Sequence, residues 1–445
     1  MATYVIVGNS AGGIGAAEAI RQVDKENELV MISDEPFPAY SRPLISEFLA
    51  GETTLEKMLY RPRDFYARHN VYAVLGKKAA RLSFDPKYVE LEDGERIAWE
   101  KLLIATGGTP FVPKTEGSDK TGVFTFTTLK DAQAIEGKLR GARSAVVIGG
   151  GLIGISVTEA LVKRGLQVSV VELKDRILNI LLDEEASALA EDAVNKAGVR
   201  IITGHTVARI LGHQDDDATV GGVVLDDGEV VACDIVVMAI GVVPRVELAR
   251  ETPIKINRGI LVDRAMRTNV PDVYACGDVA EAYDFVWQSN RVTPIWPNAY
   301  IGGRVAGFNM AGIAAEYAGG TAMNSLNYFG LAIVSAGMVS PDGQASYEVL
   351  VEKRLDEGVY KKVILRDGTV VGMAFVGEID RSGIVLGLMR DGVPVDSFKS
   401  HLTSANLNFA LFPEQLRKAR LGLTGLTGPA TSEDQVDQEM EAVVE

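Results

Sequence analysis

The sequence predicts an α/β fold in which one strand–turn–helix unit occurs twice and a smaller α+β domain follows. Three observations support this prediction. The chain has 445 residues, which at roughly 150 residues per domain suggests about three domains. An apolar run followed by a glycine cluster occurs at Tyr4–Gly13 and again at Ala145–Gly154, as expected for a duplicated unit. Gly94–Gly107 and Gly228–Gly241 both span 13 positions, so the two copies keep one register.

The first copy begins with an apolar strand at Tyr4–Val7. Asp93-Gly94 stands between alternating apolar residues, which is the signal of a β-hairpin. A buried strand at Leu102–Ala105 then ends in the small turn Thr106-Gly107. Strands that alternate with helix-length segments indicate βαβ units and a mostly parallel sheet. The corresponding elements of the second copy are Ala145–Ile148, Val168–Val171, Asp227-Gly228 and Ile235–Ala239, followed by Ile240-Gly241.

Two further segments follow the second copy. A strand at Val273–Ala275 and a helix at Ile301–Ala318 return to the first pattern, so residues 242–325 are expected to complete the first domain. Beyond about residue 325 the pattern changes to antiparallel strands, with a hairpin at Asp367-Gly368 and a short helix at Pro413–Leu421. The strands predicted in this α+β domain are Tyr328–Val334, Tyr347–Val351, Val359–Leu365 and Thr369–Val376.

Composition excludes several classes of function. A net charge of −15 argues against a nucleic-acid partner, which needs basic clusters. No apolar run reaches the roughly 18 residues of a membrane span, and Met1 leads into a strand without a basic leader, so we expect no membrane span and a cytoplasmic protein. Two cysteines, Cys233 and Cys276, are too few for a disulfide framework or a metal cluster. No metal site is expected from the four histidines either, because they lack ligand spacing: His69, His205, His213 and His401.

The second glycine cluster fits the pattern G-x-G-x-x-G with Gly149, Gly151 and Gly154, enclosing Leu152 and Ile153. Such a turn between a strand and a helix places backbone N–H groups and a helix N-terminus against a pyrophosphate. A side chain at the last glycine is therefore expected to displace the phosphate. The alternative is that the glycines only tighten the turn.

Glu172 ends the strand that follows this turn, 23 positions after Gly149. A carboxylate at that place accepts hydrogen bonds from a ribose 2′-hydroxyl and repels a 2′-phosphate. The second copy therefore predicts a site for NAD(H) in preference to NADP(H).

The first glycine cluster departs from the strict pattern because Ser10 stands where the middle glycine is expected. Its hydroxyl can itself donate to a phosphate. Asp34 and Glu35 follow the next strand, and either can hold a ribose, so the choice between them stays open. The candidate phosphate-binding residues of this copy are Gly8, Ser10, Gly12 and Gly13. The two copies together predict two Rossmann-like dinucleotide-binding domains.

In these motifs the chain resembles the two-dinucleotide-binding-domain flavoprotein reductases, the FAD/NAD(P)-dependent pyridine nucleotide oxidoreductase family. The resemblance covers residues 3 to 420 and implies FAD in the first domain and NAD(H) in the second. Val273–Ala280 resembles the family's strand-Gly-Asp motif, which suggests Asp278 and Val279 beside FAD. The family's Ala-Thr-Gly motif resembles Ala105-Thr106-Gly107, so Thr106 and Gly107 are FAD candidates. Its counterpart in the NAD half is Met238-Ala239-Ile240-Gly241, which adds Gly241.

The subfamily is decided by what lies beside the flavin. Disulfide reductases and the NADH oxidase and peroxidase branch carry a redox cysteine after the first βαβ unit, but here Pro38–Ser46 contains no sulfur. Thiolate chemistry is therefore disfavoured. Tyr40-Ser41-Arg42-Pro43 instead resembles the rubredoxin, ferredoxin and nitrite reductase branches, which places Arg42 and Pro43 against FAD. The alternative for Arg42 is a surface ion pair.

The same resemblance suggests further FAD contacts. Ala79 is a backbone candidate beside the adenine. The segment Trp296-Pro297-Asn298-Ala299 resembles a flavin-facing helix start, which makes Trp296, Asn298 and Ala299 candidates. For Trp296 a buried core position is an equal alternative. Many relatives carry a glutamate near the nicotinamide where this chain has Ser156, so the nicotinamide orientation stays open.

The resemblance implies an FAD-dependent, NADH-linked flavoprotein oxidoreductase. Hydride transfer between two stacked cofactors needs no general base, so no catalytic side chain is expected. The electron-transfer partner is expected to be an iron–sulfur or rubredoxin-type protein. The favoured role is the NAD-reactive subunit of a multi-subunit oxidoreductase acting on aldehydes or 2-oxoacids. A stand-alone NADH oxidase that reacts with oxygen and a flavin-binding signalling or scaffold protein are the alternatives.

The resulting domain prediction has four parts. Residues 1–118 and 242–325 form the FAD-binding domain, and residues 119–241 form the NAD(H)-binding domain. Residues 326–421 form a C-terminal α+β interface domain for a homodimer or for docking a partner in a hetero-oligomer. Residues 422–445, with six acids and no base, are expected to be a disordered acidic tail.

Overall fold

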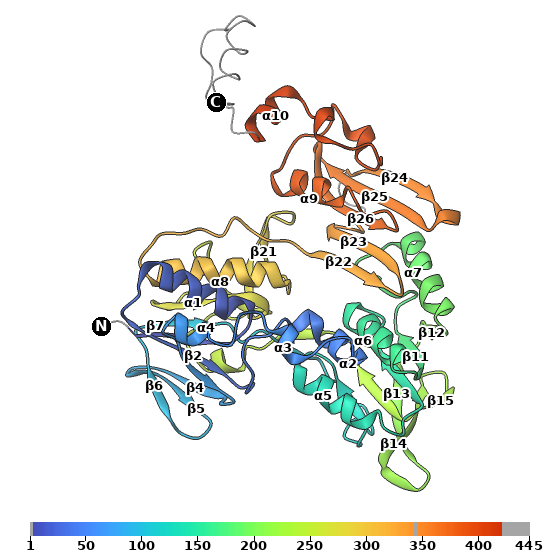
Figure 1. The fold of residues 1–445 in the computed structure, drawn as a ribbon, viewed down its shortest axis with the longest axis horizontal. Coiled ribbons are helices and arrows are strands. Elements are labelled where there is room, and N and C mark those ends of the chain that lie inside the picture. The colour runs from blue at the N-terminus through green and yellow to red at the C-terminus, as the bar shows by residue number, and fades with distance from the viewer. Residues whose placement is uncertain (1–2, 342–345, 421–445) are drawn as a thin grey trace, which may run out of the picture.

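The computed structural model describes residues 3–341 and 346–420. Two five-stranded parallel sheets lie side by side, and a third, antiparallel sheet covers them from one end (Figure 1). The predicted acidic tail, residues 422–445, lies outside the described residues. None of the helices within 3–341 and 346–420 is long and apolar enough to cross a membrane.

The two parallel sheets have the same strand order, which confirms the predicted duplication. The first runs β19-β7-β1-β2-β3, and the second runs β9-β16-β10-β11-β12. In each sheet, one edge strand comes from outside the continuous unit. β19, from later in the chain, lies beside β7, and β9, from earlier in the chain, lies beside β16. The first sheet comprises β1 (Thr3–Val7), β2 (Glu28–Ser33), β3 (Tyr72–Leu75), β7 (Lys101–Ile104) and β19 (Val273–Ala275). The second comprises β9 (Val123–Thr125), β10 (Ser144–Ile148), β11 (Gln167–Glu172), β12 (Arg200–Thr203) and β16 (Ile235–Met238).

Helices cover both sheets. In the first half, α1 (Ala11–Val23) and α8 (Trp296–Met310) lie side by side, linked by a 2.7 Å hydrogen bond from Tyr300 Oη to Glu18 Oε2 (Figure 1). The predicted helix Ile301–Ala318 is wrong at both ends, because α8 begins five residues earlier and Gly312, with φ +86°, follows its end. The other helices of the two halves are α2 (Ile45–Ala50), α3 (Leu55–Met58), α4 (Phe65–Arg68), α5 (Leu129–Lys138), α6 (Leu152–Lys163) and α7 (Glu184–Lys196).

Each half also carries a small antiparallel sheet whose turn is the predicted Asp-Gly pair. Gly94 and Gly228 have φ values of +86° and +92°, which suits glycine in a tight hairpin. These sheets comprise β4 (Ala79–Phe84), β5 (Lys87–Leu91) and β6 (Arg96–Ala98), and β13 (Val207–His213), β14 (Asp216–Leu225) and β15 (Val230–Ala232). A two-stranded sheet of β8 (Gly108–Pro110) and β17 (Val242–Pro244) joins the halves, and β18 (Ile260–Leu261), β20 (Ala280–Asp284) and β21 (Ser289–Val292) form one more sheet.

The C-terminal sheet has the order β22-β23-β26-β25-β24, with all neighbours antiparallel. The strand predicted at Tyr328–Val334 begins too early, because Phe329 and Gly330 form a turn with φ values of +50° and +81°; the residues after this turn, 331–334, do lie in a strand. The elements of this domain are β22 (Met323–Tyr328), β23 (Leu331–Gly337), β24 (Glu348–Arg354), β25 (Val359–Arg366), β26 (Thr369–Val376), α9 (Ser382–Arg390) and α10 (Glu414–Arg420), which begins one residue later than predicted.

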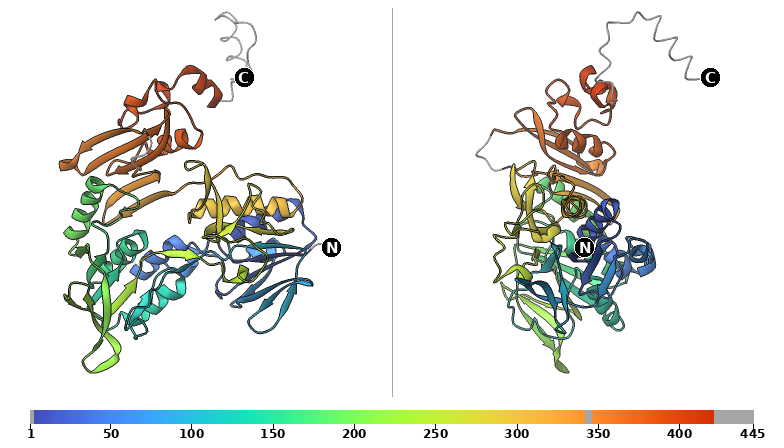
Figure 2. Two further views of the ribbon diagram at one scale, coloured as in Figure 1. Left: turned by 180° about the vertical axis from the view of Figure 1, so that it is seen from behind. Right: turned by 90° about the vertical axis from the view of Figure 1, so that its left-hand side faces the viewer.

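Both views in Figure 2 show the C-terminal sheet lying mainly against the second half, which contains the second parallel sheet. Ile333 and Tyr360 share one buried apolar cluster with α6 and α7. At the start of α7, Asp183 accepts hydrogen bonds from Tyr360 Oη at 2.6 Å and from Lys362 Nζ at 2.8 Å. Mixed apolar and charge-assisted contacts of this kind hold the domain in one orientation.

Candidate functional site

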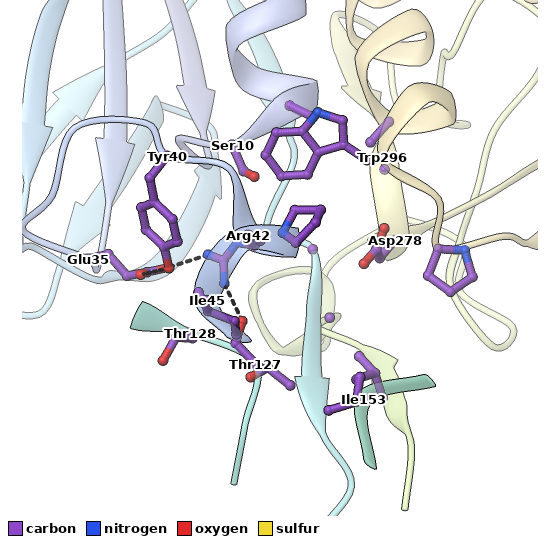
Figure 3. A pocket seen from close by; sticks show the side chains of 18 of the residues that line it. Ser10, Glu35, Tyr40, Arg42, Ile45, Thr127, Thr128, Ile153, Asp278 and Trp296 are labelled. Carbon is purple, nitrogen blue, oxygen red and sulfur yellow. Dashed lines mark hydrogen bonds and ion pairs between the residues drawn. The ribbon is translucent and has the colours of Figure 1, made fainter. Parts of the chain in front are cut away.

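A cavity of about 790 Å³ opens at the carboxyl ends of the first parallel sheet and reaches the first turns of α6 (Figure 3). Cavities at this edge of a parallel sheet are where such folds bind their ligands. Thirteen of the sixteen residues predicted to contact FAD line it. They are Gly8, Ser10, Gly12, Asp34, Glu35, Arg42, Pro43, Ala79, Thr106, Gly107, Asp278, Trp296 and Ala299.

The turn between β1 and α1 forms one wall. A Cβ on Gly8 would lie 2.0 Å from the carbonyl oxygen of Ala105, and a Cβ on Gly13 would lie 1.9 Å from the carbonyl oxygen of Gly8. These two glycines therefore let the strand, turn and helix pack together. Ser10 is the N-cap of α1, yet its side chain caps none of the helix N–H groups. These N–H groups remain free to bind an anion.

The turn between β10 and α6 repeats this geometry. A Cβ on Gly149 would lie 2.5 Å from the carbonyl oxygen of Ala239, and one on Gly154 would lie 1.8 Å from the carbonyl oxygen of Gly149. Gly154 is therefore a packing glycine, which corrects the expectation that a side chain there would mainly meet a phosphate. Gly151, the N-cap of α6, has nothing within 4 Å of its Cβ position. It is the glycine that faces open space.

Glu172 stabilises the turn between β10 and α6 through hydrogen bonds from backbone N–H groups. Its side chain is buried, with Oε2 accepting from the backbone N–H of Gly150 at 2.7 Å and Oε1 from that of Lys174 at 2.8 Å. Each carboxylate oxygen has a further lone pair for a ribose hydroxyl. The side chain therefore has a structural role in the turn in addition to any role in binding.

The acids of the first half occupy different places. Since Val7 pairs with Ile32 and Ile148 pairs with Val171, the residue equivalent to Glu172 is Ser33, not Asp34 or Glu35. Ser33 Oγ accepts from the backbone N–H two residues later, as Glu172 does. Asp34 forms a 2.7 Å ion pair with Arg245 and is more exposed than Glu35.

Arg42 links the two halves in the cavity wall. Its guanidinium pairs with Glu35 and donates to the carbonyl oxygen of Thr127 at 3.1 Å (Figure 3). Tyr40 Oη donates to Glu35 at 2.6 Å and accepts from the backbone N–H of Leu129 at 2.9 Å. The ion pair expected as the alternative for Arg42 exists, but it lies in the cavity and not on the outer surface.

Asp278 and Cys276 lie at the end of β19. Burial raises the pKa of the Asp278 carboxyl, and the charge of Arg42 opposes part of that rise. Its carboxylate points into the cavity (Figure 3), so a ligand with hydroxyl donors would satisfy it. Burial also raises the pKa of the Cys276 thiol to about 12, which keeps it protonated and unreactive.

Trp296 lies at the first turn of α8 and lines the cavity, packed edge to face with Tyr60 at a centroid distance of 5.1 Å. It is not a buried core residue. Asn298 turns away and donates to the carbonyl oxygen of Thr321 at 3.1 Å, and Val279 is completely buried. Gly13, Val279 and Asn298 are the predicted FAD residues that do not line the cavity.

The far end of the cavity is formed by α6 and by the C-terminal domain. Leu152 and Ile153 line it, as predicted, together with Ser156. The predicted NAD residues Gly149, Gly151, Gly154, Glu172 and Gly241 lie outside its lining. Residues from β22, including Tyr328, also line this end. No local sequence pattern predicts these β22 residues, because β22 reaches the site only through the packing of the third domain.

The residues present fit FAD at the first sheet. They supply an uncapped helix start, acids at the end of β2, an inward-facing buried carboxylate and an aromatic cover, around a cavity within the usual range for cofactor sites. Within the part of the chain that the structure describes, one group could hold a metal ion, namely His205 with Asp226 and Asp227. None of its three residues lines the cavity.

Comparison with known proteins agrees with this geometry. Residues 2–321 match the family model for pyridine nucleotide-disulphide oxidoreductases, and residues 323–393 match the rubredoxin NAD+ reductase C-terminal domain. The chain is 33% identical over 393 residues to the NADH-dependent phenylglyoxylate dehydrogenase subunit epsilon of Aromatoleum evansii, covering 87% of this chain and 91% of that protein.

Two further comparisons extend the likeness. The chain is 32% identical over 379 residues to the nitrite reductase [NAD(P)H] of Bacillus subtilis (strain 168), covering 84% of this chain but only 45% of that longer protein. The NADH:rubredoxin oxidoreductase structure from Clostridium acetobutylicum superposes with a TM-score of 0.73 at 25% identity, covering 90% of this chain and 97% of that one. The chain therefore belongs to the pyridine nucleotide-disulphide oxidoreductase family, as an FAD-dependent oxidoreductase that uses NAD(H).

Proposed function

We propose that this protein is the NAD-reactive subunit of a multi-subunit oxidoreductase of the aldehyde or 2-oxoacid type, and that it exchanges electrons with an iron–sulfur or rubredoxin-type partner. One observation supports it above the others. A single cavity joins the turn of the FAD half to the first turn of α6, and its one cysteine is a buried, protonated thiol. With no reactive thiol beside it, a flavin bound here would have to pass its electrons directly to the next acceptor.

The chain's own residues bind and orient the cofactors. The free N–H groups of α1 and α6 can donate hydrogen bonds to the pyrophosphates, and Asp278 can accept hydrogen bonds from ligand hydroxyl groups in the first half. Leu152, Ile153 and Trp296 present apolar surface that excludes water from the space between the two sites. Bound at these residues, FAD would supply the redox chemistry, which is uptake of an electron pair from NADH and release of electrons one at a time.

The choice of partner rests on two supports. One relative, of which this chain covers 91%, is named as a subunit of phenylglyoxylate dehydrogenase, and phenylglyoxylate is a 2-oxoacid. The C-terminal domain matches a model named for rubredoxin reductases, whose substrate is a one-electron carrier. We also propose a cytoplasmic location, supported by two free cysteines in a fold that has no need of disulfides.

The proposal is tested on the full chain under anaerobic conditions. We expect a yellow protein whose flavin absorbance bleaches within seconds of mixing with NADH and recovers when oxidised rubredoxin or ferredoxin is added. Native mass spectrometry of the protein from its own cells should show iron–sulfur subunits bound to it. A colourless protein that stays colourless after FAD is added would contradict the proposal.

Two outcomes favour the alternatives. Vigorous NADH-dependent oxygen uptake by the isolated chain would support a stand-alone NADH oxidase. A bound flavin that NADH does not reduce would support a signalling or scaffold protein.

A further inference from the structure

A tyrosine from the third domain enters the cavity beside the start of α6. Tyr328 is the last residue of β22, and its hydroxyl donates to the carbonyl oxygen of Leu152 at 3.1 Å. Ser156, one turn further along α6 than Leu152, lines the cavity beside the same tyrosine. All three residues line the cavity. Two hydroxyl groups from different domains therefore meet where the FAD half faces α6.

The tyrosine is held in this place by the turn that follows it. The backbone N–H of Phe329 donates to Glu159 Oε1 at 3.2 Å, and Glu159 is in turn paired with Lys163 at 3.5 Å on the same helix. Tyr328 and Phe329 also pack against the apolar cluster of the second half. The hairpin is thus fastened to α6 at two successive residues, and the hydroxyl is preorganised.

The chemistry of the hydroxyl pair restricts what it can bind. Burial raises the pKa of Tyr328, so its proton is retained at every accessible pH. The single proton of the Tyr328 hydroxyl is engaged with Leu152, so its oxygen can still accept a hydrogen bond, while the Ser156 hydroxyl can rotate to donate one. A neutral primary amide, which also donates and accepts, is complementary to such a pair, whereas an anion would use only its donors. Nicotinamide carries this amide, and its ring must lie at this end of the cavity if NAD(H) binds at the start of α6.

We propose that Tyr328, together with Ser156, recognises the carboxamide of the nicotinamide ring and so makes the C-terminal domain part of the NAD(H) site. This inference rests on the proposed function. It gives a role to Ser156, which lines the same end of the cavity. Tyr328 is a positioning residue, because the hydride passes between the two cofactors.

A matched pair of variants tests the inference. Tyr328→Phe removes only the hydroxyl in the cavity. Tyr360→Phe removes a second hydroxyl of the same domain, which donates to Asp183 at 2.6 Å outside the cavity. Binding of NAD+ and of ADP-ribose, which lacks nicotinamide, is measured by calorimetry on the FAD-loaded full chain, with Tm as a check of folding.

For Tyr328→Phe we expect NAD+ binding to weaken by about threefold to tenfold, the worth of one neutral hydrogen bond, with ADP-ribose binding unchanged. Ser156→Ala should show the same selectivity, and KM for NADH should rise more than kcat falls. Tyr360→Phe should lower Tm and leave both ligands unaffected.

Equal weakening of both ligands by Tyr328→Phe would mean that the tyrosine only supports the fold, and unchanged NAD+ binding would mean that it does not meet the amide. Either result overturns the inference while the proposed function stands. Failure of the wild-type protein to bind either ligand would overturn both.

Discussion

The glycines of the two turns differ in what surrounds them. Gly149 and Gly154 face backbone oxygens at distances where no side chain fits, while Gly151 faces open space. All three fit one sequence motif, so the motif alone does not separate packing glycines from ligand-facing ones. The surrounding backbone decides, and it comes from Ala239, far along the chain, for Gly149 and from Gly149 itself for Gly154.

Gly151→Val and Gly154→Val should therefore fail in different ways. We expect Gly151→Val to keep the Tm and flavin content of the wild type but to raise KM for NADH by about tenfold or more, because the side chain enters the space in front of the α6 N–H groups. Gly154→Val should lower Tm. Thermal melts and NADH titrations of both proteins distinguish these results, and a folded, fully active Gly151→Val would refute the assignment.

Glu172 offers a second test at this scale. Glu172→Gln keeps an oxygen for one backbone N–H but loses the charge, so we expect KM for NADH to rise about threefold to tenfold with a smaller change for NADPH. Steady-state kinetics with both nucleotides measure the ratio. Parallel changes would show that the side chain supports only the turn. Glu172→Ala is less informative, because it also abandons the N–H of Gly150.

The sequence predicts that Asp34 and Glu35 follow β2, but it does not show which residue of the first half corresponds to Glu172 in the second. The pairing of β1 with β2 places Ile32 opposite Val7, the end of β1, so that Ser33 is the next residue; only strand pairing reveals this register. Asp34 and Glu35 then find different basic partners, Arg245 and Arg42. Both acids line the cavity, so the choice of ribose ligand remains a proposal for mutagenesis.

At the scale of elements, the parallel strands were the most predictable part. Their apolar runs are bounded by glycines, and the observed β1 and β10 differ by one residue from the predicted strands. The hairpin of β22 and β23 was missed because Phe329, a bulky residue with φ +50°, takes a turn position usually held by asparagine or glycine. Burial of its ring against the second half compensates for this conformation.

The N-cap of α7 carries a pH-dependent contact. Burial alone would raise the pKa of Asp183, but hydrogen bonds from Lys362, Tyr360 and the backbone N–H of Ala186 outweigh it, so its pKa is lowered. A lowered folded pKa means that the stabilisation is present above the ordinary aspartate pKa of about 4 and is lost as the pH falls through the folded value.

Asp183→Asn should accordingly destabilise the protein by about 1–3 kcal/mol at pH 7, since asparagine still caps the helix but leaves Lys362 unpaired. Thermal melts between pH 3 and pH 7 should show the gap between variant and wild type narrowing below about pH 4. A gap independent of pH would mean that the charge of Asp183 contributes nothing.

At the scale of the whole molecule, one cavity draws on three parts of the chain. Arg42 belongs to the first half and holds Thr127 of the second, and β22 of the third closes the far end. Motifs predicted the first two contributors because each is a local pattern. The third depends on how a domain docks, which no local pattern encodes. The predicted domain boundaries stay a proposal, which limited proteolysis can examine.

Arg42→Ala should weaken FAD binding by about tenfold or more, because it leaves Glu35 without its cationic partner in the cavity wall and removes the hydrogen bond to Thr127. Fluorescence titration of the deflavinated protein with FAD measures this. Arg42→Lys keeps the positive charge but not the paired N–H donors, so its affinity for FAD should lie between those of the wild type and of Arg42→Ala. If Arg42→Ala kept the wild-type affinity for FAD, Arg42 would form its ion pair with Glu35 without contributing to FAD binding.

The edge strands of the two parallel sheets determine which sheet can be completed first during synthesis. β9 precedes the second unit, so all five of its strands have left the ribosome once residue 238 emerges. The first sheet must wait for β19, and its paired helix for residue 310. The second half can thus fold while the nascent chain is still growing, before the first half is complete, and the C-terminal domain follows both.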